Sequence, residues 1–259
     1  MKPHLFEEII FGPVKSRRFG ISLGINLLPV RSKFCNFDCI YCECGWTKKV
    51  NKVRGVLPSS KTIINNLIEK INLWSDQSYH IDSITFAGNG EPTLHPNFEE
   101  IVKDTLLTRD ILLPDANVVV LTNSTMLHKS SVVDVLKKVD SCMFKLDAGT
   151  ESMFRKINQP LGGISLKNTI DRIKSFPSSP IIQSMFVRGE VDGQIIDNSS
   201  PKEVAKWIGK IIEIKPEQVI IYTIDRPTAQ TGLNKITICE LSNIRNQLKA
   251  LGINASIAV

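Results

Sequence analysis

The stretch VVVLTN at residues 118–123 is a short, unbroken apolar run that ends on two polar residues. The stretch QVIIYTI at residues 218–224 has the same character. Such runs, which are rich in β-branched residues and lack polar alternation, are typical of parallel strands that are buried on both faces. The two stretches therefore predict a mostly parallel sheet.

Similar short runs recur along the chain, and helical patterns lie between them. Four further strands are predicted, at residues 21–28, 83–88, 141–147 and 181–187. Amphipathic helices are predicted at residues 59–74, 96–107, 130–139, 165–175, 201–214 and 237–251. Alternating strands and helices favour a parallel sheet that is backed by its connecting helices.

Six strand–helix units are fewer than the eight of a closed barrel. The sequence therefore predicts an α/β fold, a partial (open) (β/α)6 TIM-like barrel with a mostly parallel, curved sheet. We expect residues 1–20 to be an N-terminal extension, residues 21–235 to form the barrel, and residues 236–259 to be a C-terminal helix and tail packed on it. Ligands of such folds bind at the carboxyl ends of the strands, so polar residues there are candidates for a site.

The composition is that of a soluble globular protein, because 42% of the 259 residues are hydrophobic and 22% are charged. No apolar run is long enough to span a bilayer, so no membrane association is expected. The first residues carry two glutamates and a proline where a signal peptide needs an unbroken apolar stretch. Six cysteines are too few for a disulfide scaffold in a chain of this length. These features predict a cytoplasmic protein whose closely spaced cysteines bind metal.

Positive charge is concentrated near the N-terminus. The formal net charge is +6, and residues 1–60 account for all of it, with ten Lys and Arg against four Asp and Glu. This segment favours an anionic partner, such as a phosphate or RNA, although a solvated basic surface or compensation for an anionic cofactor would give the same pattern. Arg17 and Arg18 can bind phosphate or carboxylate bidentately. If they fold over the barrel mouth, they can hold an anionic substrate; otherwise they belong to a basic surface.

The strongest local pattern is CNFDCIYC at residues 35–42, shortly after the first predicted strand. Cys35, Cys39 and Cys42 can each bind one iron of an iron–sulfur cube, because such clusters take cysteine thiolates as ligands. Three ligands leave a fourth iron open to a small molecule. Two alternatives use Cys44 as a fourth ligand: a zinc site, which normally has four ligands, and a closed cluster that only transfers electrons.

A glycine-rich turn, AGNGEPTL at residues 87–94, directly follows the apolar residues SITF. Gly88 and Gly90 allow the backbone to approach a ligand closely, and Glu91 places a carboxylate beside the exposed backbone groups. This arrangement suits a zwitterionic ligand. Taken alone, such a turn is usually only a turn, but its position one helix after the cysteine pattern indicates a site.

Polar residues end the later strands as well. Asn123 ends the third strand, where it could bind a ligand or cap a turn. Lys145 and Asp147 share one face of the fourth strand, which should point inward. Opposite charges there are costly unless they pair with each other or with a ligand. Pocket candidates at the fifth and sixth strands are Gln183, Tyr222 and Arg226, and Tyr222 is equally suited to the core.

These patterns resemble those of one enzyme superfamily. The CxxxCxxC spacing, with Tyr41 before the last cysteine, resembles the cluster motif of the radical S-adenosylmethionine (SAM) superfamily, and GNGEP resembles its GGE motif. The stretch LTNS at residues 121–124 resembles its TNG position, with serine in place of glycine. Together with the stretches at residues 11–24, KLDAG at 145–149 and IYTIDRP at 221–227, the motifs are similar to those of Fe–S oxidoreductases that are compared with wybutosine-synthesis enzymes.

The resemblance implies a [4Fe–4S] cluster on Cys35, Cys39 and Cys42, whose open iron chelates SAM. The cluster would cleave SAM reductively, and the resulting 5′-deoxyadenosyl radical would abstract a hydrogen atom from a substrate. The resemblance also implies an electron donor that is flavodoxin- or ferredoxin-like. SAM contacts are expected from Tyr41, Gly88, Asn89, Gly90, Glu91, Asn123, Asp147, Gln183 and Tyr222. Substrate contacts are expected from Arg17, Arg18, Lys145 and Arg226.

Three functions are compatible with these patterns. The first is a radical SAM enzyme that acts on an anionic substrate, such as a nucleotide or RNA. The second is an activating enzyme that generates a glycyl radical on a protein partner, and the third is a non-enzymatic Fe–S electron carrier or sensor. No cysteine precedes Cys35, and Cys142 and Cys239 are far apart in the sequence. We therefore expect no auxiliary cluster of the kind that wybutosine-synthesis enzymes carry.

Overall fold

The computed structural model describes residues 4–47, 56–75, 80–228 and 230–258 of the chain. Half of the basic residues counted in the N-terminal segment lie outside these ranges, namely Lys2, Lys48, Lys49, Lys52 and Arg54. Within the described ranges, the basic segment keeps Lys15, Arg17, Arg18, Arg31 and Lys33.

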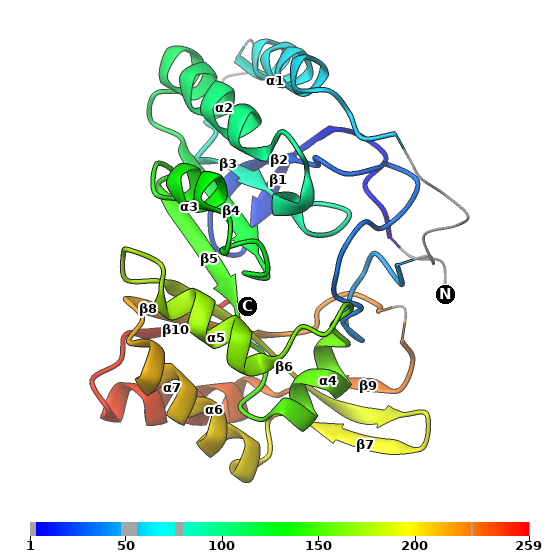
Figure 1. Cartoon of the computed structure of the whole chain (residues 1–259), viewed down its shortest axis with the longest axis vertical. Helices are drawn as coiled ribbons and strands as arrows, with labels where there is room; N and C mark the ends of the chain where they lie inside the picture. Colours follow the sequence, from blue (N-terminus) through cyan, green and yellow to red (C-terminus); the bar gives the residue numbers. More distant parts are fainter. Residues whose placement is uncertain (1–3, 48–55, 76–79, 229, 259) are drawn as a thin grey trace.

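The strands form one curved, mostly parallel sheet (Figure 1). Its parallel strands, in spatial order, are β2 (Gly20–Ile25), β3 (Ser83–Phe86), β4 (Asn117–Thr122), β5 (Ser141–Lys145), β6 (Ile181–Val191), β8 (Gln218–Thr223) and β10 (Ala255–Ile257). Chain order and spatial order agree, as expected for successive strand–helix units. The six predicted strands are confirmed. The open barrel is confirmed too, because the two ends of the sheet do not pair within the described ranges.

The structure adds strands that the sequence analysis did not predict. They are β1 (Ile10–Ser16), β7 (Gln194–Asp197), β9 (Leu233–Lys235) and β10. β1 lies within residues 1–20 and pairs with β2 in antiparallel fashion, while β7 and β9 pair antiparallel with the far end of β6. None carries an unbroken apolar run, and Pro13 interrupts β1, which edge strands tolerate.

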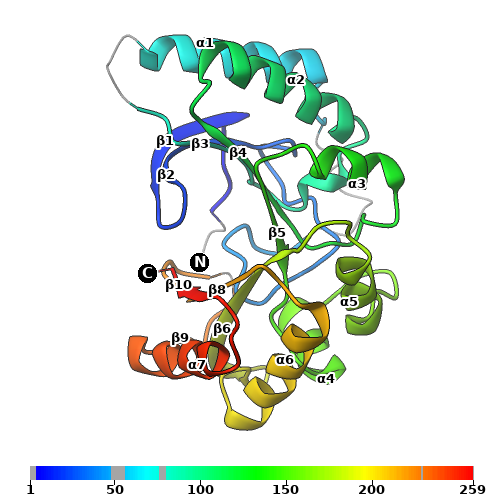
Figure 2. The same ribbon diagram turned by 90° about the vertical axis from the view of Figure 1, so that its left-hand side faces the viewer.

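Helices connect the strands and lie on the outer side of the arc that the strands describe (Figure 2). They are α1 (Ser60–Ser75), α2 (Phe98–Leu112), α3 (Ser130–Leu136), α4 (Glu151–Asn158), α5 (Leu166–Lys174), α6 (Pro201–Ile214) and α7 (Ile238–Ala250). The six predicted helices are present. α4 was not predicted, because its short sequence ESMFRKIN has few apolar positions. In the described ranges, no helix has the length and apolar character needed to cross a membrane.

Both faces of the sheet are buried, as the apolar runs predicted. In β8, Val219 and Ile221 pack in the larger core cluster with the helices, whereas Ile220 and Tyr222 belong to a second cluster inside the barrel. Because side chains alternate along a strand, every second residue of each strand faces the barrel interior. This alternation is what brings the polar residues of the strand ends into a common space.

Candidate active site

A cavity of about 550 Å³ lies at the carboxyl ends of the parallel strands. Its walls are the strand ends, the turn between β1 and β2, and the segment 33–47, called the cysteine loop below. The predicted site residues that line it are Arg17, Arg18, Cys35, Cys39, Tyr41, Cys42, Gly88, Gly90, Glu91, Asn123, Lys145, Gln183, Tyr222 and Arg226. The other two, Asn89 and Asp147, are buried and do not line it.

The cysteine loop has no regular secondary structure, and neighbouring backbone holds it near its start and at its middle. Phe34 N donates to Asn89 O at 2.8 Å, and Glu91 N donates to Phe34 O at 3.2 Å. Further along, Ile40 N donates to Ile157 O at 2.9 Å. The glycine-rich turn therefore fixes the start of the loop, and the unpredicted helix α4 fixes its middle.

Amide and backbone N–H groups approach the sulfur atoms of the cluster cysteines, the name used here for Cys35, Cys39 and Cys42. Cys35 Sγ accepts from Phe37 N at 3.4 Å and from Asn123 Nδ2 at 3.9 Å. Cys39 Sγ accepts from Asn158 Nδ2 at 3.4 Å. Hydrogen bonds to ligand sulfurs are one of the ways in which a protein tunes the potential of an iron–sulfur cluster. These contacts therefore fit thiolates that bind a cluster.

All six cysteines of the chain are free thiols. Within the described ranges, no three His, Cys, Asp or Glu side chains are close enough together to hold one metal ion. Three cysteines that each bind a different iron of a cube need no such convergence. The donor set, three thiols facing one cavity, fits a cluster with an open iron.

Lys33 supplies a buried positive charge beside the cluster cysteines, and the sequence analysis did not single it out. Its Nζ donates to Asp38 Oδ1 at 3.0 Å and to Gly45 O at 2.9 Å. Burial lowers the pKa of Lys33, but the three thiolates and Asp38 raise it by a larger amount, so its pKa lies above the ordinary value. Lys33 is therefore a fixed cation that offsets the negative charge of the thiolates. Its position two residues before the first cysteine was the available signal.

Cys44 lies next to the cluster cysteines as a protonated thiol. Its Sγ lies 3.5 Å from Gly88 O. The hydrogen bond between the Cys44 and Cys42 side chains lowers the pKa of Cys42 and raises that of Cys44. In this arrangement Cys44 keeps its proton, whereas Cys42 loses its proton more readily.

The glycine-rich turn packs tightly against the cysteine loop. Gly90 has φ of +145°, and a Cβ there would lie 2.0 Å from Phe34 O. Gly88 has φ of +130°, and a Cβ there would lie 2.6 Å from Asn26 Oδ1. The two glycines are therefore required by the close approach of the turn to its neighbours, in addition to any approach by a ligand.

The polar side chains of the turn are engaged with the protein itself. Glu91 accepts hydrogen bonds from Thr93 Oγ1 at 2.5 Å, from Thr122 Oγ1 at 2.7 Å and from Asn123 N at 2.7 Å. Burial raises the pKa of Glu91. The Asn89 side chain bonds to backbone groups, including Phe6 N at 2.9 Å, and its Oδ1 also lies 4.0 Å from Cys44 Sγ. Glu91 forms part of the cavity wall, whereas Asn89 supports the turn from outside the cavity. Both leave the backbone groups of the turn to meet a ligand.

A polar network connects the cysteine loop to the interior of the barrel. Tyr41 Oη donates to Asp147 Oδ2 at 2.5 Å, and Asn158 Nδ2 donates to the same oxygen at 2.7 Å. Lys145 Nζ lies 3.4 Å from Asp147 Oδ1 and 2.7 Å from Tyr222 Oη. Burial lowers the pKa of Lys145, and Asp147 raises it, with a net upward shift. Lys145 and Asp147 thus form an ion pair, and Lys145 also reaches the cavity.

The remaining predicted residues occupy different depths. Arg226 Nη1 pairs with Glu43 Oε2 at 3.1 Å at the exposed rim. Tyr222 Oη donates to Gln183 Oε1 at 3.5 Å inside the barrel. Arg17 is exposed, whereas the Arg18 guanidinium lies inside, with Cζ 5.3 Å from the centroid of the Tyr222 ring. The arginine pair is therefore divided between the rim and the interior.

Comparison with known sequences agrees with this geometry. A family model described as the radical SAM superfamily matches residues 30–197. The chain is 32% identical over 223 residues to a UPF0026 protein of Helicobacter pylori (strain J99), a match that covers 85% of this chain and 68% of that protein.

Comparison with solved structures shows the same fold. SuiB of Streptococcus suis, solved with bound S-adenosylmethionine, matches with a TM-score of 0.61 at 15% identity, over 89% of this chain and 51% of SuiB. TYW1, solved with a lysine-pyruvate adduct bound, matches with a TM-score of 0.61 at 13% identity, over 88% of this chain and 73% of TYW1. The chain thus spans about half the length of SuiB.

Proposed function

The chain belongs to the radical SAM superfamily, and from this premise we propose that it removes a hydrogen atom from an anionic substrate. It is a radical SAM enzyme, and the cofactors of this superfamily are a [4Fe–4S] cluster and SAM. The chain is also a relative of the UPF0026 protein of Helicobacter pylori.

One observation carries the proposal. A single parallel β-bridge between Phe34 and Gly90 holds the cysteine loop against the glycine-rich turn, and both face one cavity of about 550 Å³. The cluster, when bound, would supply the electron that cleaves SAM to a 5′-deoxyadenosyl radical able to abstract hydrogen. An electron carrier would need the thiols but would have no use for the adjoining cavity.

The residues of the chain divide the work. The cluster cysteines would hold the iron, and Lys33 offsets their charge. Backbone groups of residues 88–91, with Asn123 and the rings of Tyr41 and Tyr222, would bind and orient SAM. Asp147 holds the Tyr41 hydroxyl and thereby sets the angle of that ring in the cavity wall.

The charge of the cavity supports an anionic substrate, for which the sequence suggested nucleotides or RNA. Arg17, Arg18, Lys145 and Arg226 all line it. The acidic side chains that line it are engaged elsewhere: Glu43 with Arg226, Glu91 with Thr122, and Asp225 with Lys235. Because Lys15 and Lys33 line the cavity as well, the cations on its wall outnumber these three carboxylates.

The reaction also needs an electron donor, and the cluster needs reducing surroundings. We propose a flavodoxin- or ferredoxin-like donor, as the family resemblance implies. The cytoplasm is the proposed location, and the six free cysteines fit its reducing conditions.

The test is SAM cleavage by the anaerobically reconstituted protein. The protein would be loaded with iron and sulfide, mixed with SAM and dithionite, and assayed for 5′-deoxyadenosine. We expect product from the parent and none from the variant with Cys35, Cys39 and Cys42 all changed to Ala. Cys239→Ala, which removes an exposed thiol, is the matched control. A fully loaded cluster that neither binds nor cleaves SAM would favour the electron carrier.

A further inference from the structure

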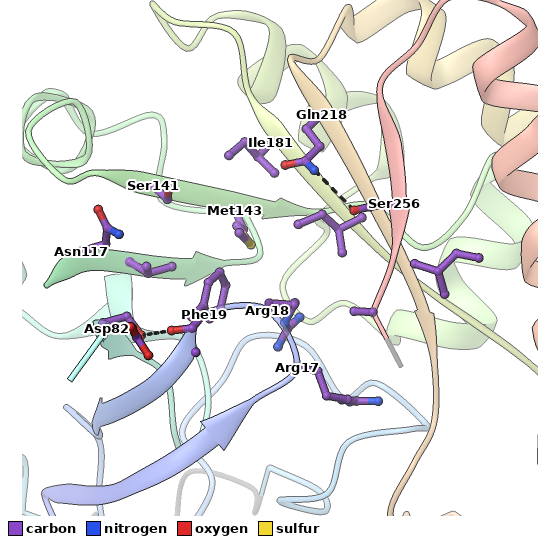
Figure 3. Close-up of a pocket in the computed structure, with 16 residues that line it drawn as sticks. Arg17, Arg18, Phe19, Asp82, Asn117, Ser141, Met143, Ile181, Gln218 and Ser256 are labelled. Carbon is purple, nitrogen blue, oxygen red and sulfur yellow. Dashed lines mark hydrogen bonds between the residues drawn. The ribbon is translucent and has the colours of Figure 1, made fainter. Parts of the chain in front are cut away.

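A second cavity, of about 680 Å³, lies at the amino ends of the parallel strands (Figure 3). The cysteine loop does not line it. Ser83, Asn117, Ser141 and Gln218 line it at the starts of β3, β4, β5 and β8. Arg18 lines both this lower cavity and the upper one beside the cysteine loop. The Arg18 guanidinium therefore lies between the two spaces.

Arg18 is a buried cation without an anionic partner. Its Nε and Nη1 atoms are shielded from solvent and have no hydrogen-bond partner. No carboxylate of the described residues lies within ion-pair distance of it. Burial lowers the pKa of Arg18, but a guanidinium stays charged at neutral pH. Buried charges are normally paired, and the protein supplies no anion for this one. An anionic ligand would therefore complete the pairing of Arg18.

The surroundings of Arg18 offer no substitute. Its Cζ lies 5.3 Å from the ring centroids of Phe19 and Tyr222, and the Tyr222 side chain also offers it a hydrogen bond, but neither residue supplies a carboxylate. Asp147, the carboxylate of the polar network, pairs with Lys145. Asp82, in the lower cavity, accepts from Ile21 N at 2.6 Å. Arg17 lines both cavities as well but is exposed, so Arg18 supplies the one guanidinium that lies inside the barrel without a carboxylate partner among the described residues.

One unit of positive charge between aromatic rings fits a singly charged, planar group. A carboxylate carries one negative charge and matches the fork of a guanidinium, whereas a phosphate monoester carries nearly two. Each cavity has the size of a small-molecule pocket, whereas RNA binding relies on several cationic contacts to successive phosphates. These observations favour a small carboxylate over RNA.

We propose that Arg18 binds the carboxylate of a small-molecule substrate at the junction of the two cavities. This proposal rests on the proposed function, because it names the class of substrate for the same site. Tyr222 and Phe19 flank the carboxylate, and the rest of the substrate extends into the upper cavity toward the cysteine loop. The polar residues at the amino ends of the strands line the lower cavity, and the substrate enters through that cavity.

The test compares benzoate with benzamide, which has the same shape without the charge. Their binding to the reconstituted enzyme with SAM would be measured by ligand-observed NMR. We expect benzoate to bind at least about tenfold more tightly, because a charge-assisted hydrogen bond is about twice as strong as a neutral one. Arg18→Gln should abolish this preference, whereas Arg31→Gln, which removes an exposed arginine outside both cavities, should retain it.

Several outcomes would overturn the proposal. They are equal binding of the two probes, a preference that survives in Arg18→Gln, and loss of SAM binding in that variant, which would place Arg18 in the SAM site. Tighter binding of inorganic phosphate or a single-stranded oligonucleotide at Arg18 would also contradict it. The binding comparison needs no SAM cleavage. The carboxylate proposal can therefore fail while SAM cleavage is observed, and it can hold even if no cleavage is observed.

If Arg18→Gln does not fold, thermal melting of a second variant, Arg18→Met, tests the proposal instead. Because the guanidinium is buried without a partner, Arg18→Met should raise the melting temperature of the protein in the absence of carboxylates. Benzoate should raise the melting temperature of the parent and leave that of Arg18→Met unchanged. A lower melting temperature for Arg18→Met would mean that Arg18 has a structural role.

Discussion

The hydroxyl of Tyr41 donates a hydrogen bond to Oδ2 of Asp147 at 2.5 Å, across 106 residues of the chain. Tyr41 lies between the second and third cluster cysteines, and Asp147 follows β5. Asp147 also accepts from Met185 N in β6 at 2.8 Å. One carboxylate thus fixes the cysteine loop to two strands of the barrel, which couples the position of the cluster to the sheet.

This coupling can be measured with a double-mutant cycle on Tyr41→Phe and Asp147→Asn. We expect an interaction free energy of about 1.5–3 kcal/mol, the range for a hydrogen bond to a charged group. Urea denaturation of the four proteins would give the free energies of unfolding. Free energies that add to within about 0.5 kcal/mol would show that the contact contributes little.

A second prediction concerns the contact between the cysteine loop and the glycine-rich turn. In Gly90→Ala, the new Cβ would lie 2.0 Å from Phe34 O, so the backbone that holds the loop must move. We expect a stability loss of more than about 2 kcal/mol, from backbone strain and overpacking together. We also expect the iron and sulfide content of the reconstituted protein to fall.

Gly193→Ala is the matched control for Gly90→Ala. Gly193 also has positive φ, of +73°, but a Cβ there meets no atom within 4 Å. This variant should show only the cost of the strained backbone, about 1–2 kcal/mol, and should keep its iron. If both variants lost iron equally, the close contact with Phe34 would not be what holds the loop.

The sequence was sufficient to predict the repeating part of the fold. Runs such as 118–123 are apolar because both faces of the strand are buried, and this demand leaves a clear pattern. β1, β7 and β9 were missed because edge pairing places no such demand on both faces. α4 was missed because much of what it does is polar: Asn158 at its end bonds to Cys39 and Asp147.

The sequence predicted which residues form the candidate site, but it did not predict the contacts that they make. Motif spacing brought the cysteines, the glycine-rich turn and Tyr222 to one cavity, as expected from strand ends that share one edge. Spacing could not show that Asn89 would bond to the backbone of Phe6, because that contact depends on the path of a distant segment. Nor could it show that Lys33 or Arg18 would be buried, because lysine and arginine are usually exposed.

A third prediction concerns acid stability and the start of α7. Thr237 caps this helix with a reciprocal hydrogen bond to Glu240, and this bond, together with Arg188, lowers the pKa of Glu240 to about 2. The folded state therefore gains stability above the ordinary pKa near 4.5, and the gain is lost as the pH falls toward 2. Since the site is exposed, we expect less than about 1 kcal/mol.

Glu240→Gln isolates the charge, because glutamine can also complete the capping box. The parent should be more stable than the variant at pH 7, and the difference should shrink as the pH falls from 4.5 to 2. Urea denaturation at several pH values would measure it, with the exposed Glu190→Gln as control. A difference that stays constant with pH would mean that the charge of Glu240 contributes nothing.

The last prediction concerns Lys33, whose buried ammonium lies beside the cluster cysteines. A positive charge favours the more negative, reduced state of a bound cluster, so Lys33→Gln should make its midpoint potential more negative. Asp38 keeps the hydrogen bond from Thr47 N, at 2.7 Å, so the loop should still close.

Redox titration followed by electron paramagnetic resonance would give the potential, with Lys70→Gln, on the outer helix α1, as control. A fully loaded cluster with an unchanged potential would show that Lys33 acts only through its contacts to Asp38 and Gly45. A more negative potential, together with slower formation of 5′-deoxyadenosine at a fixed dithionite concentration, would show that its charge sets how easily the cluster is reduced.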